Sequence, residues 1–205
     1  FGMRMAENVT RCGGKLVLIE DEWGTAVDSQ KLEDALIKHP EAKLVAFVHA
    51  ETSTGVESDV KTLCAIAHKY DCLTIVDAVT SLGGIELDVD GWGVDAIYSG
   101  TQKCLSAPPG ISPVSFNEKA VEMIKSRKTP VQSWFLDLNL VMGYCGKCAK
   151  LAYHHTCLLS ISPSPRDRLR PRMPSSALQR KLALLPFTIN FLISLHFVTI
   201  LLHVK

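Results

Sequence analysis

Residues 15–116 alternate between short runs of β-branched and apolar residues and longer stretches whose apolar positions recur at helical spacing. Between the short runs, Asp28 can cap a helix that carries Leu32 and Leu36, and Asp59 can cap the next helix. This alternation is typical of βαβ units, which form a mainly parallel sheet with helices packed on it. The predicted strands are Lys15–Glu20, Lys43–His49, Cys72–Asp77, Ala96–Ser99 and Ser112–Phe116.

Two further helices are predicted at the ends of this region. The first covers Gly2–Cys12, and the second runs from about Asn117 to Arg127. After Arg127 the pattern of apolar residues becomes irregular as far as Thr156. The regular part of the chain is therefore an α/β region, and no internal repeat is found in it.

The composition changes abruptly after Thr156. Residues 1–156 carry 15 Lys+Arg against 20 Asp+Glu, a net charge of −5, whereas residues 157–205 carry 7 against 1, a net charge of +6. A stretch rich in Ser, Pro and Arg at 160–176 leads into an almost uncharged segment, Leu182–Val204. This segment is long enough to cross a bilayer, which takes about 20 apolar residues. The alternative is that an altered transcript or a misjoined gene model supplies the whole tail.

The acidic main part carries no stripe of Lys and Arg, which argues against a nucleic acid as partner. The seven cysteines form no regular framework, and their odd number fits reduced thiols in an intracellular protein. Phe1 is followed at once by a helical pattern, without an initiator Met or a targeting signal. We therefore expect the true N-terminus to lie upstream of Phe1.

Polar residues directly follow three of the predicted strands. The stretch 49–55 follows one strand, Asp77 closes the next, and Ser99–Lys103 follows a third. In parallel α/β sheets, ligands bind at the carboxyl ends of the strands. A lysine amine can bind pyridoxal phosphate as an imine, while a carboxylate keeps the pyridine nitrogen protonated. Lys103 and Asp77 fit these two roles, and the apolar run before Asp77 agrees, since a buried carboxylate needs a positive partner.

Four motifs carry a more specific resemblance. They are Val76–Gly84 (VDAVTSLGG), Tyr98–Lys103 (YSGTQK), Ala107–Gly110 (APPG) and Tyr153–Thr156 (YHHT). In this order, and in register over residues 1–156, they resemble the alanine–glyoxylate (serine–pyruvate) aminotransferases of class V. The resemblance implies part of the large domain of a fold-type I pyridoxal-phosphate enzyme, an α/β fold with a mainly parallel sheet flanked by helices.

The resemblance does not extend to the N-terminal or the C-terminal part of the family's chains. Residues 157–205 have no counterpart in it, so we expect this basic and then apolar tail to lie outside the family fold. The glycine-rich phosphate loop and the arginine of the small domain that grips the substrate carboxylate also have no counterpart in this chain. Because transamination needs the substrate held in place, we expect the chain by itself to have little or no activity.

By this resemblance, Lys103 is the catalytic lysine that binds the cofactor. Asp77 meets the pyridine nitrogen, and Val79 packs against the ring. Thr52 reaches the phenolic oxygen of the cofactor and Gln102 touches its phosphate. For Thr52 and Gln102 an ordinary role as turn residues stays open, because Thr and Gln are common after strands.

Three further cofactor-binding residues are implied. Tyr153 and Thr156 match residues that complete the phosphate site of the neighbouring subunit, so the resemblance implies a homodimer with shared active sites. Phe1 falls where the family has the aromatic residue that stacks on the pyridine, although packing in the core is an equal alternative. The family resides in peroxisomes or mitochondria, but the chain ends in His-Val-Lys and carries no address of the Ser-Lys-Leu type.

The expected reaction is a ping-pong transamination between an amino donor, alanine or serine, and an oxo-acid such as glyoxylate or pyruvate. A non-catalytic truncated product of such an enzyme is one alternative. A cysteine desulfurase-like lyase is another, but those enzymes carry Gln and His where this chain has Thr80 and Gln102. No metal is expected. The less favoured alternative of a zinc site would use Cys145, Cys148, His154, His155 and Cys157, and His39 and His68 are expected to be exposed or capping residues rather than ligands.

Overall fold

The computed structural model describes residues 1–145, 183–185 and 198–204. Within these residues a seven-stranded sheet has the order β1-β9-β2-β5-β6-β7-β8. The first five of these strands are parallel, and β7 and β8 run antiparallel to their neighbours. The strands of the sheet are β1 (Lys15–Asp21), β2 (Ala42–Val48), β5 (Leu73–Asp77), β6 (Ala96–Tyr98), β7 (Ser112–Phe116), β8 (Ala183–Leu185) and β9 (Val198–Val204). Strands β3 (Ala50–Glu51) and β4 (Val56–Glu57) form a separate antiparallel pair.

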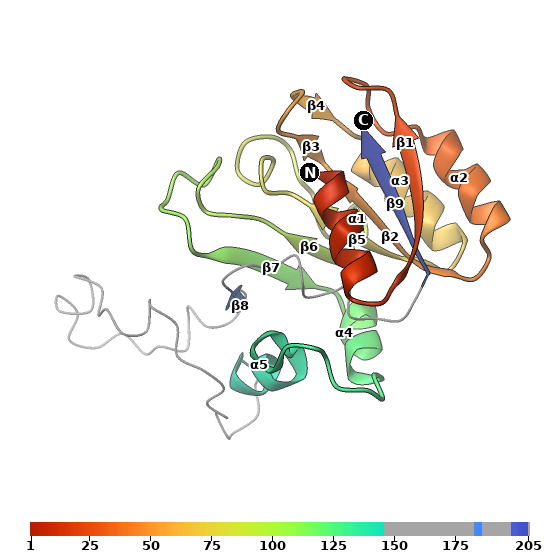
Figure 1. Ribbon diagram of the computed structural model, residues 1–205. Helices are drawn as coiled ribbons and strands as arrows, with labels where there is room; N and C mark the ends of the chain where they lie inside the picture. The colour runs from red at the N-terminus through yellow and green to blue at the C-terminus, as the bar shows by residue number, and fades with distance from the viewer. Residues whose placement is uncertain (146–182, 186–197, 205) are drawn as a thin grey trace.

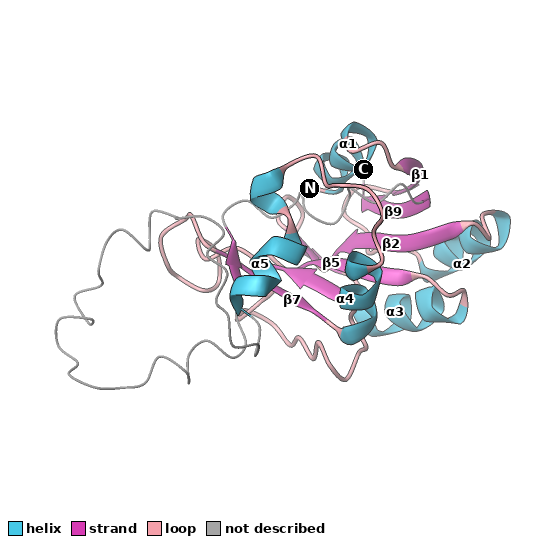
Figure 2. Ribbon diagram, turned by 90° about the horizontal axis from the view of Figure 1, so that it is seen from below, coloured by secondary structure: helices cyan, strands magenta, loops and turns pink. Residues whose placement is uncertain are grey.

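Helices lie on both faces of the sheet (Figures 1 and 2). Helices α2 and α3 cover one face, where their apolar side chains join one core cluster. Side chains of α1, α4 and α5 join the second cluster, on the opposite face. The helices are α1 (Gly2–Arg11), α2 (Ser29–Lys38), α3 (Val60–Lys69), α4 (Glu118–Lys125) and α5 (Leu138–Cys145), with a 3₁₀ turn at Trp134–Leu136.

Strand β2 shows how the sequence supplies two cores. Successive side chains of a strand point to opposite faces of its sheet. Val45 and Phe47 are fully buried against α2 and α3, whereas Leu44, Ala46 and Val48 are buried on the side of α1. A continuous apolar run is therefore required here, because both faces of the strand are covered.

The predicted α/β fold, with a mainly parallel sheet flanked by helices, is confirmed. The five predicted strands match β1, β2, β5, β6 and β7 to within one residue at each end. Both predicted helix caps are present as well. Asp28 Oδ1 accepts a hydrogen bond from the Gln30 backbone N–H at 2.8 Å, and Asp59 Oδ1 accepts one from the Thr62 N–H at 3.0 Å.

The prediction of an irregular stretch after Arg127 is wrong for residues 138–145, which form α5. This helix is apolar along most of its length, so it lacks the polar face that marks an amphipathic helix in a sequence. Leu138 and Val141 are buried in the second core cluster. Tertiary packing, rather than a local pattern, therefore accounts for the helix.

Strand β9 comes from the tail of the chain and lies between β1 and β2 (Figure 1). It is parallel to both, with Val198 opposite Lys15 of β1 and Ala42 of β2. Most of the tail lies outside the described residues, so the predicted boundary between residues 156 and 157 stays a prediction. The strand nevertheless belongs to the sheet of this chain.

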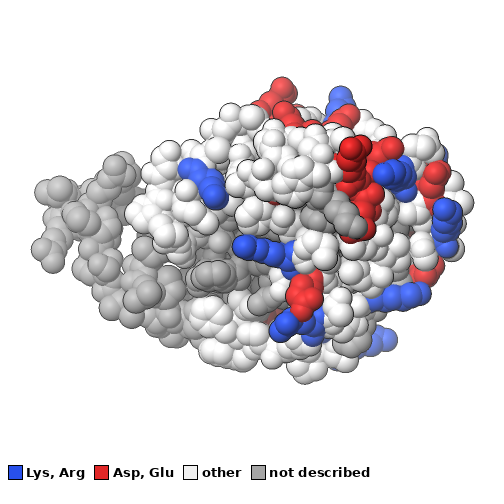
Figure 3. All heavy atoms as spheres, turned by 45° about the horizontal axis from the view of Figure 1, so that its top comes forward, with Lys and Arg blue, Asp and Glu red and all other residues white. Residues whose placement is uncertain are grey.

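Two features of the described residues concern partners. Acidic and basic side chains are interspersed on the face seen in Figure 3, and no basic stripe crosses it. No helix in the described part of the chain combines the length and the apolar character that a membrane crossing requires. Of the apolar segment 182–204, only β8 and β9 are described, and both are strands of the sheet.

Candidate functional site

Asp77 is the last residue of β5 and lies at the edge where the parallel strands β2, β5 and β6 end. Only 4% of the residue is exposed. Its Oδ1 accepts a hydrogen bond from the Val79 N–H at 2.9 Å, and its Oδ2 accepts one from the Tyr98 hydroxyl at 2.7 Å. Both carboxylate oxygens therefore have a fixed partner within the protein.

The environment of Asp77 disfavours its negative charge. Burial raises the pKa of this carboxyl, and the hydrogen bonds from Val79 and Tyr98 lower it only in part. Burial likewise raises the pKa of the Tyr98 hydroxyl, and the neighbouring Asp77 charge raises it further. A buried carboxylate of this kind gains stability from a cationic partner. A protonated pyridine nitrogen is such a partner, so the donor set fits pyridoxal phosphate.

Lys103 lies in the turn that follows β6, and its side chain is exposed. The residue next to it, Cys104, donates from its thiol to the Thr80 carbonyl at 3.2 Å. The close approach requires glycine at position 84, because a Cβ there would lie 2.6 Å from the Cys104 sulfur. The turn that carries Lys103 is thus packed against the turn that follows Asp77.

The turn after β3 is tied to the same place. The Thr80 hydroxyl donates to the Ala50 carbonyl at 2.5 Å. Thr52 is exposed at the start of this turn, two residues beyond Ala50. Thr80 therefore links three segments, which are its own turn after Asp77, strand β3 before Thr52, and the turn of Lys103.

Val79 and Gln102 also lie in these turns. Val79 is half-buried and packs against the second core cluster, on the same face of the sheet as Asp77. Gln102 is exposed, and its side-chain amide folds back over Gly100, where its Oε1 would lie 2.7 Å from an added Cβ. Both residues are placed at the strand edge that the sequence predicts.

Phe1 lies at the same edge. The Phe1 nitrogen lies 3.1 Å from Glu51 Oε2, and Glu51 is only 5% exposed. The Phe1 residue is 37% exposed, and Arg4 lies over its ring at 4.9 Å from the centroid. The ring is therefore not part of the buried core.

Several predicted residues cannot be placed. Tyr153 and Thr156 lie outside the described residues, as does most of the cysteine and histidine motif of the alternative zinc site. Among residues whose side chains are described, no group of three or more His, Cys, Asp or Glu side chains could hold a metal ion. His68 has a structural partner instead, since its Nε2 lies 2.8 Å from Asp95 Oδ2. His39 is the C-terminal cap residue of α2.

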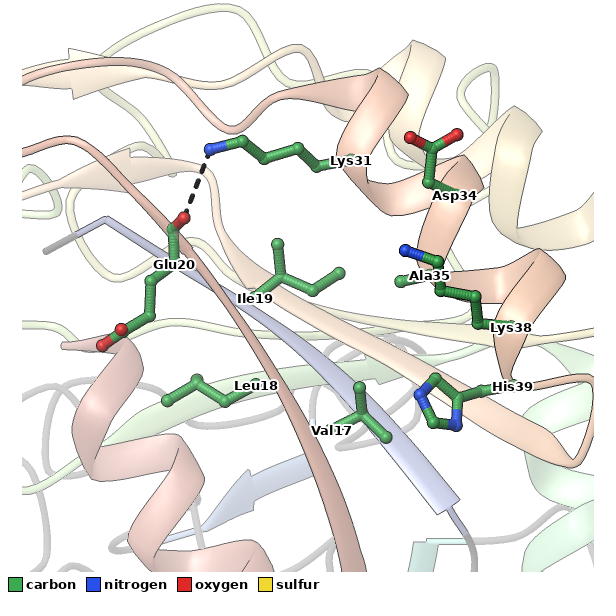
Figure 4. Close-up of a pocket in the computed structure, with 9 residues that line it drawn as sticks. All are labelled: Val17, Leu18, Ile19, Glu20, Lys31, Asp34, Ala35, Lys38 and His39. Carbon is green, nitrogen blue, oxygen red and sulfur yellow. Dashed lines mark hydrogen bonds between the residues drawn. The ribbon is translucent and has the colours of Figure 1, made fainter.

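An open depression of about 380 Å³ lies elsewhere, between β1 and α2 (Figure 4). Lys31 reaches across it and donates to the Glu20 carbonyl at 3.3 Å. None of the candidate site residues lines this depression. We therefore do not assign the cofactor to it.

Sequence reasoning missed two residues that the structure places at this site. In the sequence Tyr98 stands out only as part of a motif, yet its hydroxyl bonds the key carboxylate. Thr80 stands out only as part of a motif and as a difference from lyases, yet it links these three segments. The sequence signal for Tyr98 is its place near the end of the predicted strand that follows β5, whereas its pairing with Asp77 depends on the register of the two strands.

Comparison with known proteins gives consistent matches. The family model described as aminotransferase class-V matches residues 3–130. Alanine–glyoxylate aminotransferase of Rattus norvegicus is 38% identical over 157 residues, which are 76% of this chain and 38% of the rat protein. The (S)-ureidoglycine–glyoxylate transaminase of Bacillus subtilis is 42% identical over 188 residues, covering 83% of this chain and 44% of that protein.

Solved structures agree with these matches. Alanine–glyoxylate aminotransferase from Nostoc sp. superposes with a TM-score of 0.65 at 33% identity, over 77% of this chain and 48% of that one. Ureidoglycine–glyoxylate aminotransferase from Bacillus subtilis also gives a TM-score of 0.65, at 32% identity, over 76% of this chain and 46% of that one. The chain therefore spans less than half the length of these relatives.

Proposed function

Because this chain belongs to the class-V aminotransferase family, we propose that it provides the cofactor-binding part of a pyridoxal-phosphate aminotransferase that uses glyoxylate as amino acceptor. Glyoxylate is common to the names of the rat and Bacillus subtilis relatives, whereas their donors differ. The single observation that carries the proposal is the buried Asp77 carboxylate, with the Lys103 turn packed against the turn that follows it.

Each candidate residue would make a different contact with the cofactor. Lys103 would hold the cofactor covalently through its amine, and Asp77 would hold the proton on the pyridine nitrogen. Val79 would pack against the ring, while Thr52 and Gln102 would bind the phenolic oxygen and the phosphate. When bound, pyridoxal phosphate supplies an electron sink for the substrate carbon that loses its proton.

The chain's own contribution to the reaction is proton transfer and positioning. The Lys103 amine would be the base that moves the α-proton of the substrate. The mobility of an exposed lysine in a turn suits this exchange of roles. Asp77 differs in that it is buried and doubly hydrogen-bonded, so its position stays constant during turnover.

Three amino donors are candidates, because the relatives differ in the donor that their names give. Alanine and serine are the donors expected from the family resemblance. The match to the Bacillus subtilis transaminase adds (S)-ureidoglycine as a candidate donor. A homodimer with shared active sites, to which Tyr153, Thr156 and Phe1 would contribute, and a peroxisomal or mitochondrial location are further parts of this proposal.

A titration with pyridoxal phosphate tests the proposal. The whole chain is expected to develop the visible absorbance band of a lysine-bound cofactor, and Lys103→Ala is expected to abolish it. Lys128→Ala is the matched control, because Lys128 is also exposed but lies beyond α4. A band of equal strength in the Lys103→Ala chain would contradict the proposal, and absence of any band in the unchanged chain would favour the non-catalytic alternative.

A further inference from the structure

Tyr98 and Asp77 form a hydrogen-bonded pair inside the protein. They are direct partners in the parallel ladder between β5 and β6, so their side chains leave the sheet on the same face. The Tyr98 hydroxyl donates to Asp77 Oδ2 at 2.7 Å, and the two residues are 5% and 4% exposed. This hydroxyl is thus the one described side-chain donor that is hydrogen-bonded to the carboxylate.

The pair can be interpreted in two ways. In the simpler interpretation, Tyr98 is a core aromatic residue whose hydroxyl needs any acceptor. The choice of acceptor argues for more, because a hydrogen bond to a charged group is about twice as strong as a neutral one. The main-chain N–H of Val79 already fixes the other oxygen, Oδ1, so the Tyr98 bond completes the orientation of the carboxylate.

We propose that Tyr98 is a positioning residue that acts through Asp77: its hydroxyl fixes the carboxylate in one orientation and favours its ionised form, as binding of the pyridine nitrogen requires. This inference rests on the proposed function, since it concerns the same carboxylate. Tyr98 touches neither the cofactor nor the substrate in this account.

The surroundings of Asp77 disfavour its negative charge, and the hydrogen bond from the Tyr98 hydroxyl offsets part of this effect. The Glu51 carboxylate repels the Asp77 charge. Burial acts in the same direction as Glu51 and is the largest influence on the pKa of Asp77. The hydroxyl of Tyr98 and the N–H of Val79 are therefore the two neutral groups that counteract the burial of this charge.

The first test needs no cofactor. The unfolding free energy is measured against pH for the unchanged chain, Tyr98→Phe, Asp77→Asn and the double variant. The curve of Asp77→Asn is subtracted from that of the unchanged chain, and the curve of the double variant is subtracted from that of Tyr98→Phe. Each difference isolates the change in unfolding free energy that accompanies titration of the Asp77 carboxyl, which we call the pH step. Loss of a hydrogen bond to a charged group changes an equilibrium by about tenfold or more. We therefore expect Tyr98→Phe to move this step to higher pH by about one unit.

The second test uses pyridoxal phosphate as the probe. Tyr98→Phe is expected to weaken binding by about tenfold in the chain with Asp77. In the Asp77→Asn background the same change should have little further effect, because the charge on which it acts is gone. A role in packing alone would weaken binding equally in both backgrounds.

Tyr70→Phe is the matched control. The Tyr70 hydroxyl donates to Glu33 at 3.0 Å, next to α2 and α3 and away from the strand ends. It should change neither the pH step nor the affinity. If Tyr98→Phe proved insoluble, fluorotyrosine placed at position 98 would keep the shape and strengthen the donor, and the step should then move to lower pH.

The outcomes separate this inference from the proposed function. A chain that binds no pyridoxal phosphate overturns the proposed function, but the pH step still decides on Tyr98. An unmoved step, or an equal shift in Tyr70→Phe, overturns the inference. If Tyr98→Phe moves the pH step and weakens binding of pyridoxal phosphate only in the chain that keeps Asp77, the positioning role of Tyr98 is established.

Discussion

At Asp77, folding stability and the proposed binding of pyridoxal phosphate make opposite demands on one carboxyl. Its pKa in the folded chain is raised above the ordinary value of 3.8, chiefly by burial. The folded state therefore holds this proton more tightly than the unfolded state. The resulting stability is fully present below pH 3.8 and is lost as the pH rises through the folded-state pKa.

Asp77→Asn should thus stabilise the cofactor-free chain at neutral pH, because it removes a buried charge and keeps the side-chain shape. The same change should weaken the binding of pyridoxal phosphate, since an amide cannot hold the pyridinium proton. Thermal unfolding with and without the cofactor measures both effects. A neutral-pH stability that falls on substitution would show that the carboxylate is better compensated than this geometry indicates.

The sequence predicted Asp77 and Lys103 because each follows an apolar strand, and strand ends meet at one edge of a parallel sheet. It could not predict what holds the carboxylate. The hydroxyl of Tyr98 and the two contacts of Thr80 depend on the register of β5 with β6 and on the packing of turns, which are tertiary facts. The sequence predicts which residue types lie at the strand ends, but it does not predict which of them contact one another.

At the scale of elements, helix caps fix where the helices begin. Asp59 accepts the Thr62 N–H on Oδ1 and the Thr62 hydroxyl on Oδ2, the latter at 2.6 Å. Hydrogen bonds from the side chain and the backbone of Thr62 lower the pKa of Asp59. A carboxyl whose pKa is lower in the folded state than in the unfolded state stabilises the fold above its unfolded-state pKa. This stabilisation is lost as the pH falls through the folded-state pKa.

Asp59→Ala is expected to cost about 1 kcal/mol of unfolding free energy at neutral pH, the usual value of an N-cap. Chemical denaturation should show this cost shrinking as the pH falls below the ordinary value of 3.8. Asp59→Ser retains a capping oxygen and should keep most of the stability. A cost that is independent of pH would argue that the charge of Asp59 contributes nothing.

Asp95 joins four elements of the fold. This carboxylate, 1% exposed, accepts hydrogen bonds from the Thr74 backbone and hydroxyl, and its oxygens lie 2.8 Å from His68 Nε2 and 2.6 Å from Asn117 Nδ2. These partners belong to β5, to α3 and to the cap of α4. Asp95 itself immediately precedes β6, so the network fixes how helices and strands meet.

Asp95→Ala is expected to cost about 3 kcal/mol, because several donors lose a charged acceptor. Asp90→Ala, a change at an exposed aspartate in the preceding turn, should stay within about 0.5 kcal/mol. Urea denaturation of both variants provides the comparison. Equal small losses would show that water replaces the carboxylate and that the network is not structural.

Most elements of the parallel core could be predicted from the sequence, but helix α5 and strand β9 are among those that could not. Helix α5 carries almost no polar residues, so its sequence has no helical periodicity to detect. Strand β9 is a short apolar run, and nothing local in such a run specifies that it pairs with β1 and β2.

At the scale of the whole molecule, β9 closes the gap between β1 and β2. These two strands each pair with β9 and not with one another. Without it, backbone N–H and C=O groups along the facing sides of both strands would lose their partners. The sheet that positions Asp77 therefore depends on a segment at the opposite end of the chain.

A chain truncated after residue 197 should exchange the amide hydrogens of β1 and β2 faster, by about tenfold or more. Amides of β6, which does not contact β9, should change much less. Hydrogen exchange followed by mass spectrometry gives this comparison element by element. Unchanged exchange in β1 and β2 would show that β9 does not hold them in solution.

In the proposed function, one pyridine ring is held between Lys103 and Asp77. The most direct measurement is borohydride reduction of the chain with bound pyridoxal phosphate, followed by peptide mapping of the labelled lysine. We predict a single major label on Lys103, with occupancy reduced by Asp77→Asn at limiting cofactor. A label spread evenly over exposed lysines, and unaffected by Asp77→Asn, would contradict the account.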